Sequence, residues 1–367
     1  YPDIDMPTAI TQIAGRKVAA EKIPSWWEIE KIWYPKHLSL EQCSSEITAR
    51  YKARLLQGDS LTDLTGGFGI DCSFLATGFK SATYVERQEE LCEIAAHNFP
   101  VLNLNHINIK NEDGVTYLQA MSPVDCLFLD PARRNEHGGK TVAISDCEPN
   151  VAELEELLLQ KANRVMIKLS PMLDLSLALK ELKQTQEVHI LSVNNECKEL
   201  LILLGQTSPA EISIHCVNLF TKGTQKEQHF VFTREQEQCS ECTYTDSLET
   251  YLYEPNASLL KAGAFRSIAA AYPVRKLHPN SHLYTSDTFI ENFPGRIFRI
   301  VNQCSFNKKE VKENLADLKK ANVTVRNFPA TVAELRKRIH LAEGGDTYLF
   351  ASTLNNGQKV LIRCEKV

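Results

Sequence analysis

Residues 58–71, Gly-Asp-Ser-Leu-Thr-Asp-Leu-Thr-Gly-Gly-Phe-Gly-Ile-Asp, constrain the fold of this chain more than any other stretch. Their apolar run at 61–64 is typical of a strand, the cluster of three glycines predicts a tight turn, and a helical pattern follows. Glycine is needed where φ is positive or where backbone approaches a ligand closely. A strand, glycine turn and helix start place backbone N–H groups at one sheet edge, which favours a polar or anionic ligand.

Two acidic residues accompany this turn. Asp63 precedes the first glycine by three residues, and Glu86 ends the next apolar run, Ala82–Val85. An acid at the end of the strand after a glycine turn is placed to accept hydrogen bonds from ribose hydroxyls. The glycine spacing matches neither the G-x-G-x-x-G dinucleotide fingerprint nor the Walker phosphate loop. By itself, the turn therefore also fits an ordinary α/β unit.

Strand and helix patterns alternate after this turn, which predicts a mostly parallel sheet with helices on both faces. Strands are expected at 59–64, 81–86, 106–111, 124–130, 163–169 and 187–193, and helices at 69–77, 87–98, 114–120, 150–160, 173–184 and 196–204. Two later strands, 212–220 and 229–233, have a short polar link and predict an antiparallel edge hairpin. The expected fold class is α/β.

The 367 residues exceed the usual size of one domain. We expect a helical N-terminal segment at 1–57, an α/β domain at 58–235, a connector at 236–292 and a small α+β domain at 293–367. One helix is expected at 39–56, another at 258–271 in the connector, and a third at 308–321. The sequence Asn355-Asn356-Gly357 predicts a hairpin turn.

Charge is distributed unevenly along the chain. Residues 293–367 hold 14 Lys/Arg and 7 Asp/Glu, a balance of +7, whereas the remainder has a balance of −12, for a total of −5. A basic segment attached to an acidic body indicates a polyanionic partner.

Composition also bears on location. The odd number of cysteines, eleven, favours free thiols in a reducing cytoplasm over a disulfide framework. The close pair Cys239 and Cys242 could be half of a zinc site, but we find no complementary ligands and expect no metal. No apolar run approaches the ~20 residues of a membrane span. No secretory signal or obligate protein partner is evident.

The order of these motifs resembles that of class I S-adenosylmethionine-dependent methyltransferases, over roughly residues 40–235. The similarity rests on Asp63-x-Thr65-Gly66-Gly67-x-Gly69, then Glu86, Asp113 and Asp130-Pro131-Ala132-Arg133. The form of the glycine turn is especially similar to that of bacterial rRNA methyltransferases. The C-terminal segment resembles THUMP-like domains of RNA-modifying enzymes, although true THUMP domains usually precede the catalytic domain. The resemblance implies a Rossmann-like methyltransferase sheet.

This resemblance implies S-adenosylmethionine as the cofactor. The backbone of Thr65–Gly69 would line its methionine part, and Asp63 would orient the turn or receive the ammonium group through water. Glu86 would accept two ribose hydroxyls, because a carboxylate suits two donors, and the neighbouring Arg87 would lie at the same site. Asp113 would accept from the adenine amine, or would cap a helix.

The sequence Asp130-Pro131-Ala132-Arg133-Arg134 ends the fourth strand, where ligands bind in open α/β sheets. Amine-methylating relatives have Asp/Asn-Pro-Pro-aromatic there, with the carboxylate and a carbonyl holding the target amine. This chain keeps the first two positions only. Arg133 could stack on a base or contact a phosphate, and Arg134 is a further candidate substrate contact.

A second interpretation concerns Lys168, which lies at the end of the fifth strand. With Asp130, Lys52 and Glu196 it resembles the Lys-Asp-Lys-Glu tetrad of ribose 2′-O-methyltransferases. Such a lysine could have a lowered pKa and deprotonate a hydroxyl, or could simply pair with Asp130.

The expected function is methylation of rRNA or tRNA at a base amine or a ribose hydroxyl. The candidate RNA contacts in the basic segment are Lys308, Lys309, Lys312, Arg336 and Lys337, although a solvated helix face would look the same. The alternatives are a non-catalytic RNA-binding protein that kept the fold, and a small-molecule methyltransferase.

Overall fold

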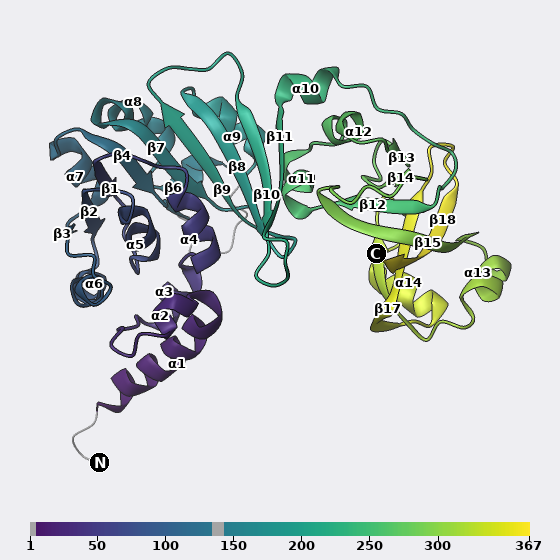
Figure 1. Cartoon of the computed structure of the whole chain (residues 1–367), viewed down its shortest axis with the longest axis horizontal. Coiled ribbons are helices and arrows are strands. Elements are labelled where there is room, and N and C mark those ends of the chain that lie inside the picture. The colour runs from purple at the N-terminus through teal and green to yellow at the C-terminus, as the bar shows by residue number, and fades with distance from the viewer. Residues whose placement is uncertain (1–4, 134–142) are drawn as a thin grey trace. The chain divides into compact units, whose positions relative to one another are not determined.

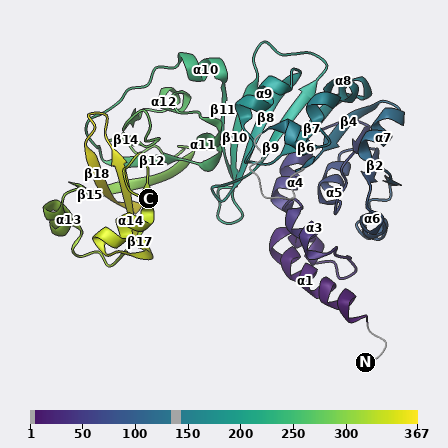
Figure 2. The same cartoon turned by 180° about the vertical axis from the view of Figure 1, so that it is seen from behind.

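The structure, a computed structural model, describes residues 5–133 and 143–367. The chain divides into two compact units, one formed by residues 1–193 and 198–213 and the other by residues 194–197 and 214–367. Figure 1 shows the elements of both units, and Figure 2 shows them from behind. The expected α/β class is confirmed, with a large mostly parallel sheet and a separate C-terminal sheet.

Nine strands form the large sheet in the order β11-β10-β8-β9-β7-β4-β1-β2-β3. Their bounds are β1 Ser60–Asp63, β2 Ser81–Glu86, β3 Ile107–Asn111, β4 Val124–Leu129, β7 Ala162–Leu169, β8 Thr185–Val193, β9 Glu196–Gly205, β10 Ser213–Leu219 and β11 Glu227–Thr233. The run β3-β2-β1-β4-β7 is parallel throughout. Strands β4 and β7 are almost wholly buried, as their continuous apolar sequences require.

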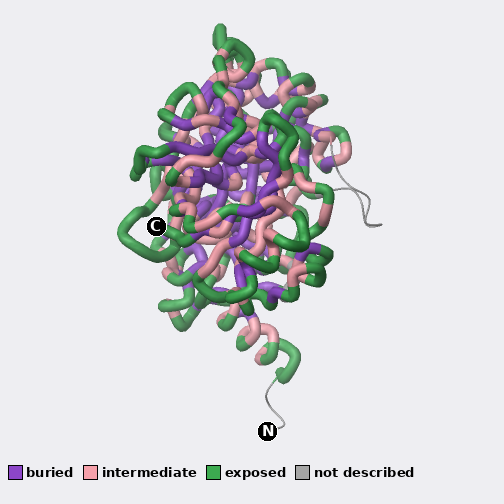
Figure 3. The backbone as a smooth tube through the Cα atoms, turned by 90° about the vertical axis from the view of Figure 1, so that its right-hand side faces the viewer, coloured by how far each residue is buried: buried purple, intermediate pink, exposed green. Residues whose placement is uncertain are grey.

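Helices flank this sheet in the first unit, as Figures 1 and 2 show. They are α4 Glu46–Ala53, α5 Ile70–Ala76, α6 Glu89–Val101, α7 Gly114–Ala120, α8 Val151–Lys161 and α9 Leu175–Glu181. Between β4 and α8 lie the short strands β5 Ala132–Arg133 and β6 Cys147–Glu148 and the 3-10 turn η1 Ile144–Asp146. Figure 3 shows the buried residues concentrated inside the fold and the exposed ones around it.

The expected helix at 196–204 is wrong, because this segment is β9, which runs antiparallel to β7. The apolar run Leu200–Leu204 suits a buried strand as well as a buried helix, and all five residues are fully buried. The turn before it decides the structure. Asn194 and Asn195 both have positive φ, 49° and 67°, a conformation that asparagine tolerates and that closes tight hairpins.

The N-terminal segment contains α1 Met6–Lys22, α2 Pro24–Trp27 and α3 His37–Gln42. The single helix expected at 39–56 is wrong, because the extended ψ of 160° at Cys43 separates α3 from α4. The apolar core of this segment includes Trp26, whose ring lies 5.3 Å from that of Phe68 in the glycine turn. The helical segment therefore supports the turn from outside the sheet.

The second unit has a seven-stranded sheet in the order β13-β14-β12-β15-β18-β17-β16. Its strands are β12 Tyr251–Pro255, β13 Arg275–Lys276, β14 Tyr284–Ser286, β15 Gly295–Ser305, β16 Lys320–Val325, β17 Ala342–Thr353 and β18 Lys359–Lys366. Its helices are α10 Arg234–Cys239, α11 Ala257–Ala262, α12 Ser267–Ala271, α13 Lys308–Leu315 and α14 Val332–Ile339. The expected connector and the basic tail thus contribute strands to one sheet.

Two helix predictions in this unit need correction. The helix expected at 258–271 is broken at Gly263, whose φ of 76° ends α11. The helix expected at 308–321 ends at Leu315, because residues from Lys320 onward pair with β17. The turn at residues 355–357 does connect the antiparallel strands β17 and β18, with Gly357 at φ 86°.

Across the described residues, no helix combines the length and the apolar character needed to cross a membrane. The eleven cysteines are all free thiols.

Candidate functional site

Polar side chains collect at the carboxyl edge of the parallel strands of the first unit. Asp63 ends β1, Glu86 ends β2, Asp130 directly follows β4, and Lys168 is the penultimate residue of β7. Because neighbouring parallel strands end at the same edge, their terminal side chains lie close together. This edge is where open α/β sheets bind their ligands.

The glycine turn at this edge requires each of its glycines. Gly67 and Gly69 have φ of 54° and 86°, which side chains disfavour. A Cβ atom on Gly66 would lie 2.2 Å from the ring of Tyr84, so no larger residue fits there. The Tyr84 hydroxyl also donates to the Gly67 carbonyl at 2.5 Å. The turn is therefore held against β2, with Thr65 and Gly67 as its partly exposed residues at the edge.

The Glu86 carboxylate faces this turn. Its Oε2 accepts from the N–H of Gly67 at 2.9 Å and its Oε1 from the N–H of Gln88 at 2.8 Å, with the residue 9% exposed. Each oxygen keeps further acceptor capacity for ribose hydroxyls. Arg87 is exposed, and its guanidinium lies 3.5 Å from the Glu148 carboxylate.

Thr65 connects the turn to the end of β4. Its N–H donates to Asp63 Oδ1 at 3.0 Å, and its hydroxyl accepts from the N–H of Asp130 at 2.6 Å. Asp63 is 1% exposed, and its Oδ2 has no hydrogen-bond partner among the described residues. Burial raises the pKa of Asp63 to about 8. This carboxyl orients the turn and keeps one buried oxygen for a further partner.

Asp113 is an exposed N-cap of α7. Its Oδ1 accepts from the N–H groups of Val115 and Thr116, each at 3.0 Å. The next residue, Gly114, approaches the end of β1 so closely that a Cβ atom there would lie 2.2 Å from the Leu64 carbonyl oxygen. The capping alternative is therefore observed, and the cap lies beside the strand that leads into the glycine turn.

Beneath this edge lies a buried ion network. Lys52, which is fully buried, donates to Ser44 Oγ at 3.0 Å and Glu199 Oε1 at 2.7 Å, and lies 3.0 Å from Asp71 Oδ1. Lys168 lies 2.6 Å from Asp130 Oδ2 and donates to Asp71 Oδ2 at 3.3 Å.

The Ser44 hydroxyl joins the two ammonium groups. It also accepts from Lys168 at 3.1 Å and donates to Asp71 Oδ2 at 2.7 Å. Each ammonium group therefore has three polar contacts, and that from Lys52 to Asp71 Oδ1 is an ion pair only, since this oxygen accepts no hydrogen bond from the described residues. The Asp130 side chain is 38% exposed, against 10% or less for Lys52, Asp71 and Lys168. Asp130 is therefore the member of the network that meets solvent.

The charges in this network decide the protonation of Lys168. Burial alone would lower the pKa of Lys168, but the carboxylates of Asp130, Asp71 and Glu199 outweigh it and raise that pKa well above its ordinary value. Burial would likewise raise the pKa of Asp71, but Lys52 and Lys168 lower it to about 2. The expectation of a lysine with a lowered pKa is therefore wrong, and Lys168 keeps its proton.

Three network members were not predicted from the sequence. Glu196 was the expected carboxylate, but it is exposed, and Glu199 is the residue that pairs with Lys52. In a helix these two glutamates would share a face, whereas in a strand an odd separation puts them on opposite faces. Asp71 was within the motif but resembled an ordinary acid of a first helical turn, and the hydroxyl of Ser44 gave no signal.

The remaining substrate predictions vary in outcome. Pro131 is buried directly after Asp130. Arg134 and the side chain of Arg133 lie outside the described residues. In the second unit, Lys308 and Lys312 line a cavity. Lys309 and Lys337 are exposed. Arg336 is 17% exposed in its side chain and lies 3.9 Å from Glu343.

Comparison with known proteins identifies the second unit in part. A ferredoxin-like domain family matches residues 251–294, and a THUMP domain-like family matches residues 295–366, which confirms the expected THUMP-like module. No curated protein matches the chain.

Among solved structures, the chain is similar to a "putative methyltransferase from Porphyromonas gingivalis W83". The two share 37% identity over 100% of this chain and 92% of the other, with a TM-score of 0.90. Distant similarity extends to the modification subunit of a "putative type I restriction enzyme from Vibrio vulnificus YJ016" (12% identity, 55% and 56% covered, TM-score 0.38). It also extends to a "putative methyltransferase" from Streptococcus mutans in complex with SAH (14%, 44% and 96%, TM-score 0.32).

The ion network predicts a large stability cost for losing one lysine. The substitution Lys52→Met should lower the free energy of unfolding by about 3–5 kcal/mol, because Asp71 and Glu199 lose a cationic partner in a buried setting. The matched control is Lys36→Met, whose exposed pair with Glu90 should contribute only about 0–1 kcal/mol. Denaturant unfolding measures both, and equal effects would show that the network is not a buried unit.

The raised pKa of Asp63 predicts a pH effect of definite sign. Between its ordinary value of 3.8 and about 8, the folded carboxyl keeps a proton that the unfolded one has lost. Stability should therefore fall as pH rises through this window, by up to about 1.4 kcal/mol per pH unit. Asp63→Asn cannot ionise, so its unfolding free energy should be flatter across the window. Subtracting the unfolding free energy of Asp63→Asn from that of the wild type at each pH removes the contribution of other titrating groups. A difference that does not change with pH would contradict the raised pKa of Asp63.

Proposed function

Because the chain belongs to the same protein family as the methyltransferase-like protein of P. gingivalis, we propose that it is an S-adenosylmethionine-dependent methyltransferase acting on rRNA or tRNA. The observation that carries this proposal is the Glu86 carboxylate, which faces the glycine turn through its contact with the Gly67 N–H. A carboxylate and a partly exposed glycine turn at one sheet edge form a site for a nucleoside.

The residues at this edge fit S-adenosylmethionine. In this turn Gly66, Gly67 and Gly69 allow a ligand to approach the backbone closely, and Glu86 offers acceptors for two ribose hydroxyls. The buried Oδ2 of Asp63 has no partner among the described residues, and the cationic end of such a cofactor would favour the ionised form of this carboxyl. Asp113 would hold the adenine amine and Arg87 would lie at the rim. When bound, this cofactor supplies an electrophilic methyl group.

Asp130 would hold the group that receives the methyl. Its carboxylate is partly exposed, and Lys168 fixes it from below at 2.6 Å. A base amine can donate an N–H to this carboxylate and attack through its nitrogen without first losing a proton to a strong base. The raised pKa of Lys168 makes this lysine a poor base for deprotonating a hydroxyl. We therefore propose a base amine as the preferred methyl acceptor. The backbone carbonyl of Pro131 would be a second hydrogen-bond acceptor for this amine.

A ribose hydroxyl is the second candidate. The observation in its favour is that Lys52, Asp130, Lys168 and a glutamate, Glu199, do gather in one network. In this arrangement the lysines would orient the substrate and balance charge instead of removing a proton.

RNA as the partner rests on the THUMP domain-like match at residues 295–366 and on the basic balance of that segment. We infer a cytoplasmic enzyme from the substrate class and the free thiols. A non-catalytic RNA-binding protein would leave RNA unlabelled when given labelled methyl donor, and a small-molecule enzyme would label no RNA while still binding the cofactor product.

The cofactor assignment predicts tight binding of S-adenosylhomocysteine that depends on Glu86. Glu86→Gln should weaken binding at least about tenfold, because hydrogen bonds to a charged acceptor contribute about 1.5–3 kcal/mol. Isothermal calorimetry measures this, with Glu89→Gln, an exposed acid at the start of α6, as the matched control. Failure of the wild type to bind, or equal affinity of the two variants, would remove the proposal.

A further inference from the structure

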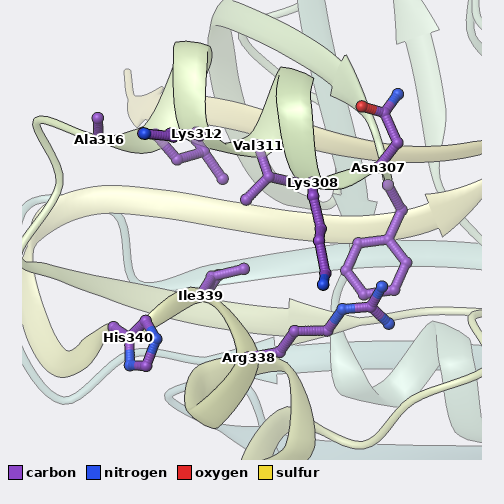
Figure 4. Close-up of a pocket in the computed structure, with 10 residues that line it drawn as sticks. Asn307, Lys308, Val311, Lys312, Ala316, Arg338, Ile339 and His340 are labelled. Atoms are coloured by element: carbon purple, nitrogen blue, oxygen red, sulfur yellow. The ribbon is translucent and has the colours of Figure 1, made fainter.

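A cavity of about 250 Å³ lies between α13 and α14 in the second unit (Figure 4). Its lining includes Phe306 and four basic or imidazole side chains, those of Lys308, Lys312, Arg338 and His340. Among the described residues that line it, none is acidic. Such a lining is notable in a chain whose net charge is −5, and it selects for an anionic ligand.

The arginine in this cavity lies over an aromatic ring and has no carboxylate partner among the described residues. The Arg338 guanidinium lies 4.1 Å from the centre of the Phe306 ring, which itself packs edge-on against Phe328 at 4.9 Å. Within the described part of the chain, none of Arg338, Lys308 and Lys312 forms an ion pair. The other arginines of residues 295–366 each contact a carboxylate: Arg296, Arg299, Arg326, Arg336 and Arg363.

This contrast separates Arg338 from an ordinary surface arginine. A guanidinium that already covers one aromatic ring presents its second face as a flat, charged surface, and nucleic-acid bases stack on such surfaces. Because the Phe306 ring limits its motion, less side-chain freedom is lost when a base binds.

The two lysines supply the complementary charge. Lys308 and Lys312 are one turn apart on α13 and therefore share a face. Figure 4 shows the Lys308 side chain reaching from α13 toward Arg338 on α14. Lys312 extends its ammonium group away from these two, toward Ala316. The like charges of Lys308 and Arg338 repel each other, and an anion beside both relieves that repulsion. Phosphate is the anion that lysines and arginines commonly bind.

The size of the cavity limits the ligand. Pockets for drug-sized ligands or cofactors usually measure about 300–1,000 Å³, and this one, at about 250 Å³, is smaller. It can take part of one nucleotide but not an entire adenosyl cofactor.

We propose that this cavity binds one unpaired nucleotide of the RNA substrate, with the base against the Arg338 guanidinium, the phosphate on Lys308, and Lys312 adding positive charge from the same helix. The inference rests on the RNA partner of the proposed function and is independent of its cofactor. A free mononucleotide has the same chemistry, so the test must distinguish the two sources.

The test is fluorescence anisotropy of the full chain with a labelled single-stranded RNA decamer, without methyl donor. Lys308→Gln/Lys312→Gln should weaken binding about tenfold or more. The charge-matched control Lys309→Gln/Lys337→Gln changes exposed lysines of the same two helices that do not line the cavity, and should change binding less than twofold. Arg338→Lys keeps the positive charge but removes the planar guanidinium group on which a base can stack, and should weaken binding at least about fivefold.

Several results would overturn this assignment. Equal losses in the two lysine pairs would indicate a diffuse basic surface, and unchanged binding of Arg338→Lys would exclude stacking. Duplex RNA that binds as tightly as the single strand would exclude an unpaired base. If free UMP displaced the labelled decamer at concentrations as low as those of the decamer itself, the cavity would be a site for mononucleotides and not for RNA. Calorimetry with S-adenosylhomocysteine on the same samples reports the cofactor site separately, and unchanged thermal unfolding confirms that the variants fold.

Discussion

The contact on which the first unit most depends is the pair of buried ammonium groups that share one serine hydroxyl. Lys52 comes from α4 and Lys168 from β7, and Ser44 accepts a hydrogen bond from each. Placing two cations in the interior is costly unless each N–H and each carboxylate finds its partner. The break between α3 and α4, the first turn of α5 and the antiparallel strand β9 each place one partner, so the network fixes several elements at once.

This network reaches the sheet edge through Asp130, which stands between the buried lysine and solvent. The Thr65 hydroxyl accepts a hydrogen bond from the Asp130 N–H, and the Thr65 N–H donates to Asp63. In the same turn, the Gly67 N–H donates to Glu86. A single set of contacts therefore connects the proposed cofactor site with the proposed methyl-acceptor site. The ion pair with Lys168 makes Asp130 an anchored acceptor, and in the proposed reaction this favours an amine over a hydroxyl as the group it holds.

The sequence alone could predict the parts of the site whose residues are close together in the chain. The glycines at 66–69, Asp63 and Glu86 follow from local turn geometry and strand ends, and the structure brings them together. Glu199 could not be predicted, because the apolar run beside it fits a helix and a strand equally, and the Asn194-Asn195 turn that decides between them is evident only from its positive φ angles. The direction of the Lys168 pKa depends on three carboxylates from three other elements, which no local pattern reveals. The cavity of the second unit could not be predicted either. Which exposed lysines of α13 line it depends on the position of α14, which the sequence does not give.

The most direct test of the central claim is to identify the atom that carries the methyl group. Wild-type protein and Asp130→Asn would be incubated with isotopically labelled methyl donor and unmodified rRNA and tRNA, and the nucleosides would be analysed by mass spectrometry. The account predicts label on a base nitrogen with the wild type, and little or none with the variant. Label on the ribose 2′-oxygen, or labelling of RNA by Asp130→Asn at the wild-type rate, would contradict it.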